Sequence, residues 1–79
     1  MKDREPTVTM TVNQLCLTYD ALTDKAVDWR NELRRRAKAG ETEGGLRRNF
    51  DEVLDARDIV ANELRKYGIQ RNTSANWRD

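Results

Sequence analysis

The sequence contains no histidine, one cysteine and one proline. Without histidine the chain lacks the commonest general base and the commonest zinc ligand, and Cys16 alone forms neither an internal disulfide nor a metal site. We therefore expect no metal, no cofactor and no enzymatic activity. No apolar run approaches the length that spans a bilayer, and the N-terminal residues lack the apolar core of a signal peptide. We expect a cytoplasmic protein that makes no membrane contact.

Neither sign of charge dominates, because 15 Lys and Arg residues face 14 Asp and Glu residues and the formal net charge is +1. This balance argues against a general nucleic-acid binder, which usually carries a basic excess. Charged and apolar residues each make up 37% of the chain, which suits exposed helices with apolar stripes. Two helices in a chain of 79 residues enclose little surface, so we expect a homo-oligomer.

Large apolar or small residues recur at alternating spacings of three and four in two parts of the chain, as in the seam of a coiled coil. The first part contains Val12, Leu15, Tyr19, Leu22, Ala26, Trp29 and Leu33. The second part contains Leu46, Phe50, Val53, Arg57, Val60, Leu64 and Tyr67. The two seams predict an all-α fold, an antiparallel two-helix hairpin. Further apolar residues widen the second stripe beyond what one partner helix covers, which again favours an oligomer.

Capping residues predict where the helices begin and end. Thr11 or Asn13 is expected to cap the first helix, and Gly40 to end it after Ala39. Thr42 is expected to cap the second helix. That helix is expected to run to Tyr67 and to end at Gly68, with Ile69 making the apolar contact that follows a left-handed glycine.

The hairpin is expected to cover residues 11–69, between an extended N-terminal arm over residues 1–10 and a flexible C-terminal tail over residues 70–79. The alternation of residues 7–12 also fits a short strand, and the sequence leaves this question open. Trp77 lies in the polar tail, where it either docks on another subunit or target or stays loose.

A basic surplus is predicted at the turn of the hairpin. The candidate ligand-binding residues there are Arg35, Arg36, Lys38, Arg47 and Arg48. Arginine forks match phosphate oxygens, so this cluster indicates an anion site. The alternative is a solvated helix end paired to nearby acids, which are Glu41, Glu43, Asp51 and Glu52.

Arg57 is a further candidate ligand-binding residue, because it occupies a seam position where an apolar side chain is expected. It faces the small Ala26 across the predicted hairpin, which leaves room for its stem and lets the guanidinium reach solvent. Either it contacts a ligand or it specifies the register of the helices. Acids that would neutralise it in the second case are Asp28, Asp55 and Asp58.

The hairpin resembles the helical hairpin domain of the phage anti-CBASS and anti-Thoeris sponges over residues 19–61. The matching features are Tyr19-Asp20-Ala21-Leu22 followed by Ala26, a turn near Gly40, and Phe50-Asp51-Glu52-Val53-Leu54. The aromatic and proline-containing segment that precedes the first helix in that family has no counterpart in residues 6–12, which contain no aromatic residue, and Ala56 stands at the family's late tryptophan. The resemblance implies an oligomeric hairpin that sequesters a cyclic nucleotide without catalysis.

Three functions follow from these observations. The first is a small non-enzymatic binding protein of the phage anti-defence type, which sequesters a cyclic nucleotide or related anionic signal through arginine contacts. The second is a helical interaction module that inhibits or adapts a host protein. The third is a weak nucleic-acid-binding protein, which the near-neutral charge disfavours.

Overall fold

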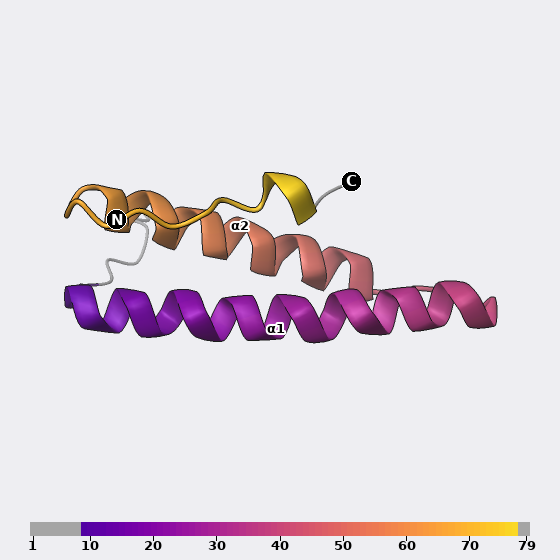
Figure 1. Cartoon of the computed structure of the whole chain (residues 1–79). Coiled ribbons are helices and arrows are strands. Elements are labelled where there is room, and N and C mark those ends of the chain that lie inside the picture. Colours follow the sequence, from indigo (N-terminus) through magenta and orange to yellow (C-terminus); the bar gives the residue numbers. More distant parts are fainter. Residues whose placement is uncertain (1–8, 78–79) are drawn as a thin grey trace, which may run out of the picture.

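The computed structural model describes residues 9–77 and contains three helical segments and no strand in that range. Helix α1 spans Val12–Ala39, helix α2 spans Leu46–Arg65, and the short 3-10 helix η1 spans Ala75–Trp77. Helices α1 and α2 lie side by side and run in opposite directions (Figure 1). The predicted all-helical hairpin is confirmed, and its oligomeric state stays a prediction. Most of the expected N-terminal arm lies outside the described residues, as do residues 7 and 8 of the segment with strand-like alternation.

The ends of α1 follow the predicted capping chemistry. Thr11 Oγ1 accepts a hydrogen bond from Gln14 N at 3.0 Å, and Gln14 Oε1 accepts one from Thr11 N at 2.9 Å. This reciprocal pair is a capping box. Gly40 ends the helix at φ +72°, and Glu41 N donates to Arg36 O at 2.9 Å. Glycine adopts this left-handed conformation without steric cost, so the helix stops there.

For α2, the prediction from the sequence matches the structure better at the C-terminal end than at the N-terminal end. The prediction that Thr42 caps the helix is wrong, because Gly45 occupies the N-cap and Thr42 Oγ1 accepts from Gly44 N within the turn, at 3.2 Å. The predicted left-handed glycine is confirmed, since Gly68 has φ +79° and Ile69 N donates to Leu64 O at 3.2 Å, but α2 ends at Arg65, before the expected Tyr67. The Ile69 side chain packs against the core cluster that contains Leu64.

The core forms two clusters along the hairpin. One consists of Leu15, Tyr19, Ala61 and Leu64, and the other of Ala26, Leu33, Phe50 and Leu54. On α1 the buried residues all belong to the predicted seam. On α2 the buried side is shifted, because Leu54 and Ala61 are buried whereas the expected seam residues Val53 and Val60 are only partly buried. Tyr67, also expected in the seam, lies beyond the end of α2 and is 54% exposed.

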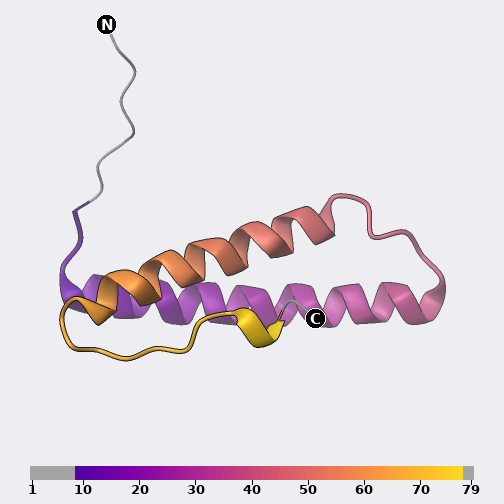
Figure 2. The same ribbon diagram turned by 90° about the horizontal axis from the view of Figure 1, so that it is seen from above.

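The C-terminal segment causes this shift. After Gly68 the chain turns back, and residues 70–77 lie against the hairpin beside α2 (Figures 1 and 2). Ser74 is fully buried, and its N–H donates to Asp58 Oδ1 at 2.7 Å. Residues 70–77, expected as a flexible tail, thus have a defined position on the hairpin in this structure. This segment is held by backbone and small polar groups, which leave no apolar pattern in the sequence.

Replacement of Leu54 by alanine tests the shifted core. Leu54 is 0% exposed, so Leu54→Ala should lower the free energy of unfolding by about 2–5 kcal/mol through lost burial and the cavity left behind. The control is Leu17→Ala on α1, since Leu17 is 61% exposed, and it should change stability by less than about 0.5 kcal/mol. Urea unfolding followed by circular dichroism measures both. Equal losses in the two variants would contradict this packing.

Candidate functional site

Arg57 connects both helices with the C-terminal segment. Its Nε donates to Thr23 Oγ1 at 2.7 Å, Nη1 to Ser74 Oγ at 2.8 Å, and Nη2 to the Tyr19 hydroxyl at 2.7 Å. Its side chain lies against the Tyr19 ring, 4.7 Å from the centroid. The residue is 5% exposed, so the expectation that its guanidinium reaches solvent is wrong. The three hydroxyls make burial possible because a buried guanidinium needs acceptors for its donors.

The same contacts hold the C-terminal segment in place. The Tyr19 hydroxyl, which accepts from Arg57, itself donates to Asn72 O at 2.7 Å. Asp58, one of the acids expected to neutralise Arg57, accepts the Ser74 N–H. Both contacts place the chain just before η1 in a defined position on the hairpin.

The position of Trp77 follows from this docking of the C-terminal segment. It is partly buried and packs against the cluster that contains Leu33 and Phe50. Arg30 of α1 lies over its ring, with Cζ 4.4 Å from the centroid, and Arg57 lies 5.2 Å from the same ring. The Arg30 Nε is buried and has no hydrogen-bond partner within the described part of the chain. Trp77 is therefore a wall of a site on this hairpin.

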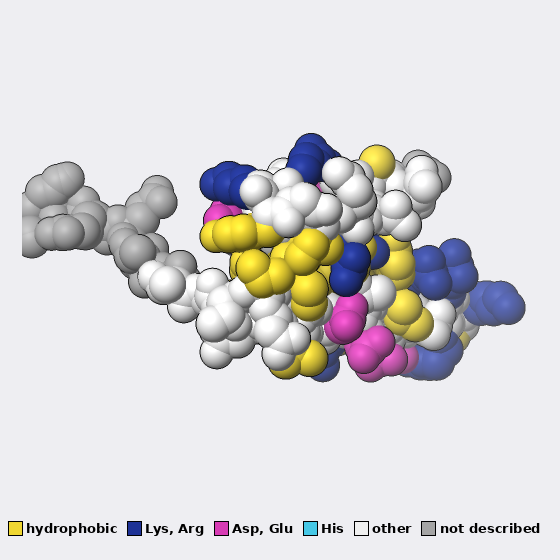
Figure 3. Space-filling view, turned by 60° about the vertical axis from the view of Figure 1, so that its left-hand side comes forward, with side chains coloured by type: hydrophobic (Ala, Val, Ile, Leu, Met, Phe, Trp, Pro, Cys, Tyr) yellow, Lys and Arg dark blue, Asp and Glu magenta, His cyan; other side chains and the backbone are white. Residues whose placement is uncertain are grey.

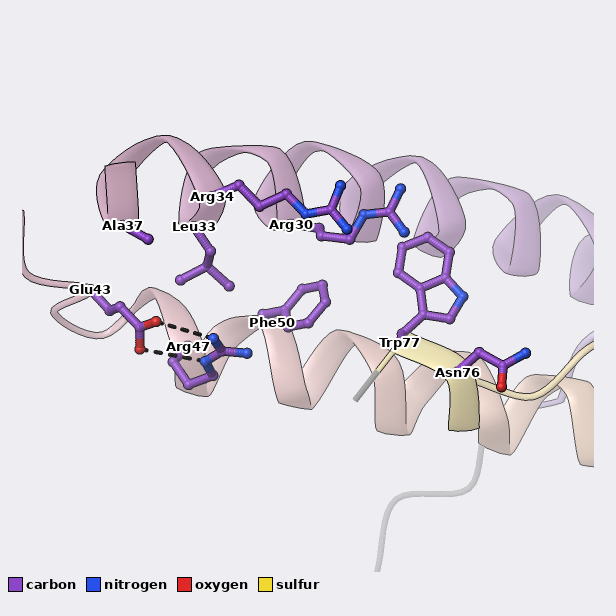
Figure 4. Close-up of a pocket in the computed structure, with 9 residues that line it drawn as sticks. All are labelled: Arg30, Leu33, Arg34, Ala37, Glu43, Arg47, Phe50, Asn76 and Trp77. Carbon is purple, nitrogen blue, oxygen red and sulfur yellow. Dashed lines mark hydrogen bonds and ion pairs between the residues drawn. The ribbon is translucent and has the colours of Figure 1, made fainter. Parts of the chain in front are cut away.

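A cavity of about 310 Å³ opens between the end of α1, the start of α2 and η1 (Figure 4). Arg30 and Arg34 project side by side from α1 along its upper edge in this view, and Trp77 and Phe50 present their rings below them. The lining residues are Arg30, Leu33, Arg34, Ala37, Glu43, Arg47, Phe50, Asn76 and Trp77. The cavity thus combines cationic side chains with two aromatic walls.

Its charge is positive because only one of its arginines is neutralised. Arg47 Nη2 lies 3.1 Å from Glu43 Oε2, and this pairing raises the pKa of Arg47. Arg34 makes no ion pair in the part of the chain that the structure describes. Lys and Arg side chains gather at the turn end of the hairpin, at the right in Figure 3. Within residues 9–77 neither Arg30 nor Arg34 makes an ion pair, so the unpaired positive charge of the cavity lies on these two arginines.

The structure distributes the six sequence-predicted site residues over different environments. Only Arg47 lines the cavity. Arg35 and Arg36 share Glu32, at 2.7 and 2.8 Å, and Arg36 Nη1 also donates to Glu43 O at 3.1 Å. Arg57 is buried. Lys38 and Arg48 are exposed and do not line the cavity. For Arg35 and Arg36, the alternative of a helix end paired to acids describes the structure.

Arg30 and Arg34 line the cavity but are not among the site residues expected from the sequence. Their i, i+4 spacing puts them on one face of a helix, next to Leu33 and Ala37, and this signal was available. Trp77 had no such signal, because its place depends on how the C-terminal segment folds back.

No family model, curated protein or solved structure matches the chain. The likeness to the sponge hairpins therefore rests on the residues quoted for it. Within residues 9–77 no three potential metal ligands gather at one place. In the same range no helix is long and apolar enough to cross a bilayer.

The shared carboxylate of Glu32 makes stability depend on pH. Hydrogen bonds from Arg35 and Arg36 lower the pKa of Glu32 from 4.5 to about 2. The stabilisation is complete above pH 4.5 and is lost as the pH falls towards 2, because protonation ends both contacts. Glu32→Gln should therefore show a smaller fall in melting temperature between pH 4.5 and 2 than the parent protein. The effect should be a few degrees at most, since the contacts are exposed.

Glu52→Gln serves as the control, because Glu52 is an exposed carboxylate of α2 that makes no such contact with any residue from 9 to 77. Circular dichroism melts over a series of pH values should show the same fall in melting temperature below pH 4.5 for this control as for the parent protein. If Glu32→Gln also shows the full fall in melting temperature, the contacts of Glu32 with the two arginines do not stabilise the fold.

Proposed function

We propose that this protein binds, without catalysis, a small anionic ligand that carries a planar ring, and that a cyclic nucleotide is the ligand class. The observation that carries the proposal is the pair Arg30 and Arg34 beside the rings of Trp77 and Phe50 at one cavity. Arginine binds phosphate oxygens through paired donors, and nucleobases stack on aromatic side chains. The arginines thus match the phosphate half of a nucleotide, and the partly exposed ring of Trp77 is the surface open to the base, since Phe50 is 1% exposed and forms the floor of the cavity.

The volume of the cavity limits the size of the ligand that it can hold. A volume of about 310 Å³ lies at the lower end of the range for small-molecule pockets. We infer that one nucleotide unit occupies it, with the rest of a larger cyclic molecule outside. Another copy of the chain would cover that remainder in the homo-oligomer that the small core favours.

The biological role in this proposal is sequestration of a signal in the cytoplasm by a phage anti-defence protein. It is supported by the resemblance to sponge hairpins over residues 19–61 and by the cationic, ring-lined cavity. A sequestering protein needs affinity alone, and the cavity offers positive charge and stacking surface.

Removal of one unpaired arginine tests the proposal. Arg34→Ala should weaken binding about 10- to 100-fold, because it removes charge-assisted hydrogen bonds of about 1.5–3 kcal/mol. The matched control is Arg48→Ala, which removes the same charge from an exposed position outside the cavity. Isothermal titration calorimetry with cyclic di-AMP, cyclic di-GMP and cyclic tri-AMP, beside thermal shift, measures the affinities.

The outcomes separate the candidate functions. Equal weakening in both variants would contradict a site at the cavity, and absence of binding by every probe would contradict the proposed ligand class. A strongly salt-dependent affinity for DNA that exceeds the affinity for the cyclic nucleotides would favour the nucleic-acid-binding alternative.

A second candidate function, a helical interaction module, has its own supporting observation. At the end of the hairpin away from the turn, a second cavity of about 310 Å³ is lined by Met10, Leu15, Ile59, Val60 and Glu63. Ile59 is 68% exposed. A groove with exposed apolar side chains suits the apolar face of a helix, from a second copy or from a host protein.

A charge placed in this groove tests the second candidate. Ile59→Lys should leave the helical content unchanged and should lower the molar mass of any assembly measured by light scattering, because a lysine cannot be buried there without cost. The control is Asn62→Lys, which adds the same charge at an exposed residue of α2 outside the cavity. An unchanged mass for an assembling protein would exclude this groove as the contact.

A further inference from the structure

The cavity is built from two parts that are held together by few contacts. Helices α1 and α2 supply Arg30, Arg34, Arg47 and Phe50, whereas the C-terminal segment supplies Asn76 and Trp77. The segment has no apolar stripe of its own to hold it on the hairpin. Besides the packing of Trp77 itself, its place comes from the polar contacts of the residues just before η1.

Ser74 is the centre of these contacts. It is 0% exposed, its N–H donates to Asp58 Oδ1, and its Oγ accepts from Arg57 Nη1 at 2.8 Å. The next contact towards the N-terminus is Asn72 O, which accepts from the Tyr19 hydroxyl. These bonds lie three and five residues before Trp77, so they restrict where its ring can lie.

We propose that Arg57 and Ser74 are positioning residues for the ligand site, and that docking of the C-terminal segment sets the affinity of the cavity. This inference rests on the proposed function, since it concerns the same cavity. Neither residue touches the ligand. Their hydrogen bonds place Trp77 under Arg30, and the ligand binds the hairpin only when that wall is present.

Thermodynamic linkage predicts how undocking of the C-terminal segment changes the affinity for the ligand. The apparent affinity of a site equals its intrinsic affinity multiplied by the fraction of molecules in the binding-competent state. A segment with few buried apolar contacts opens at low cost compared with global unfolding. A change that undocks the segment should therefore weaken ligand binding while the helices keep their stability. Bound ligand should in turn hold the segment closed.

A pair of neighbouring substitutions tests this proposal. Ser74→Arg places a long cation in a fully buried position against the guanidinium of Arg57, so the segment should undock. Thr73→Arg places the same cation one residue earlier, where the side chain is exposed. The two variants have the same composition of charge and differ only in burial. Tyr19→Phe is a milder variant, since it keeps the ring and removes the hydroxyl that joins Arg57 to Asn72.

Two measurements read docking and binding separately in the full-length chain. Proton–nitrogen NMR resolves the indole N–H signals of Trp29 and Trp77, and Trp29→Phe assigns them. Calorimetry with cyclic di-AMP and with inorganic pyrophosphate measures affinity. In Ser74→Arg the Trp77 signal should move to its position in the unfolded chain, and the affinity for cyclic di-AMP should fall by about tenfold or more. Tyr19→Phe should show a smaller change of both kinds.

Controls keep the inference separate from the proposed function. The circular dichroism melt of Ser74→Arg should retain the helices, and Thr73→Arg should match the parent protein in all measurements. A Trp77 signal that stays in place in Ser74→Arg, or one that moves while affinity is unchanged, would overturn the positioning role. A parent protein that binds neither probe would overturn the proposed site, and the NMR spectra would then still decide whether Ser74 docks the segment.

Discussion

The buried guanidinium of Arg57 is the interaction on which the rest of this structure depends. A cation in the centre of a two-helix seam is costly unless its donors are satisfied, and here they reach hydroxyls on α1 and on the C-terminal segment. The segment therefore depends on the helices for its position, since Arg57 of α2 and Tyr19 of α1 supply its hydrogen-bond partners. Because the segment ends in Trp77, the same hydrogen bonds decide where the aromatic wall of the cavity stands.

Electrostatics at the turn of the hairpin depends on which cations are already paired. The chain is close to neutral overall, and Glu32 and Glu43 hold Arg35, Arg36 and Arg47. Paired arginines on a surface offer little to an incoming anion. Arg30 and Arg34 differ from these paired arginines. Arg30 stacks on Trp77, and Arg34 has no acidic partner among the described residues. A small number of unpaired charges beside aromatic rings gives the site its chemistry.

The two flanks of the hairpin are covered unequally. The C-terminal segment closes one flank and buries Leu54 together with Ser74. Val60 and Glu63 lie about 140–160° around α2 from Asp58, which contacts that segment. The groove that they line with Ile59 is therefore on the other flank, and it retains exposed apolar surface. Part of the apolar surface of α2 that α1 does not cover is thus covered by the C-terminal segment, and part remains exposed.

The sequence by itself determined the two helices, their antiparallel packing, the capping box at Thr11 and the glycine endings at Gly40 and Gly68, because these features depend on local spacing and local backbone conformation. Only the tertiary structure decided the docking of residues 70–77, the burial of Arg57, the shift of the α2 core towards Leu54, and the choice of Arg30 and Arg34 over Arg35 and Arg36 at the cavity. These outcomes rest on hydrogen bonds between residues 16 to 53 positions apart and on competition among acids for arginines. Neither leaves a periodic pattern, so a single sequence does not reveal them.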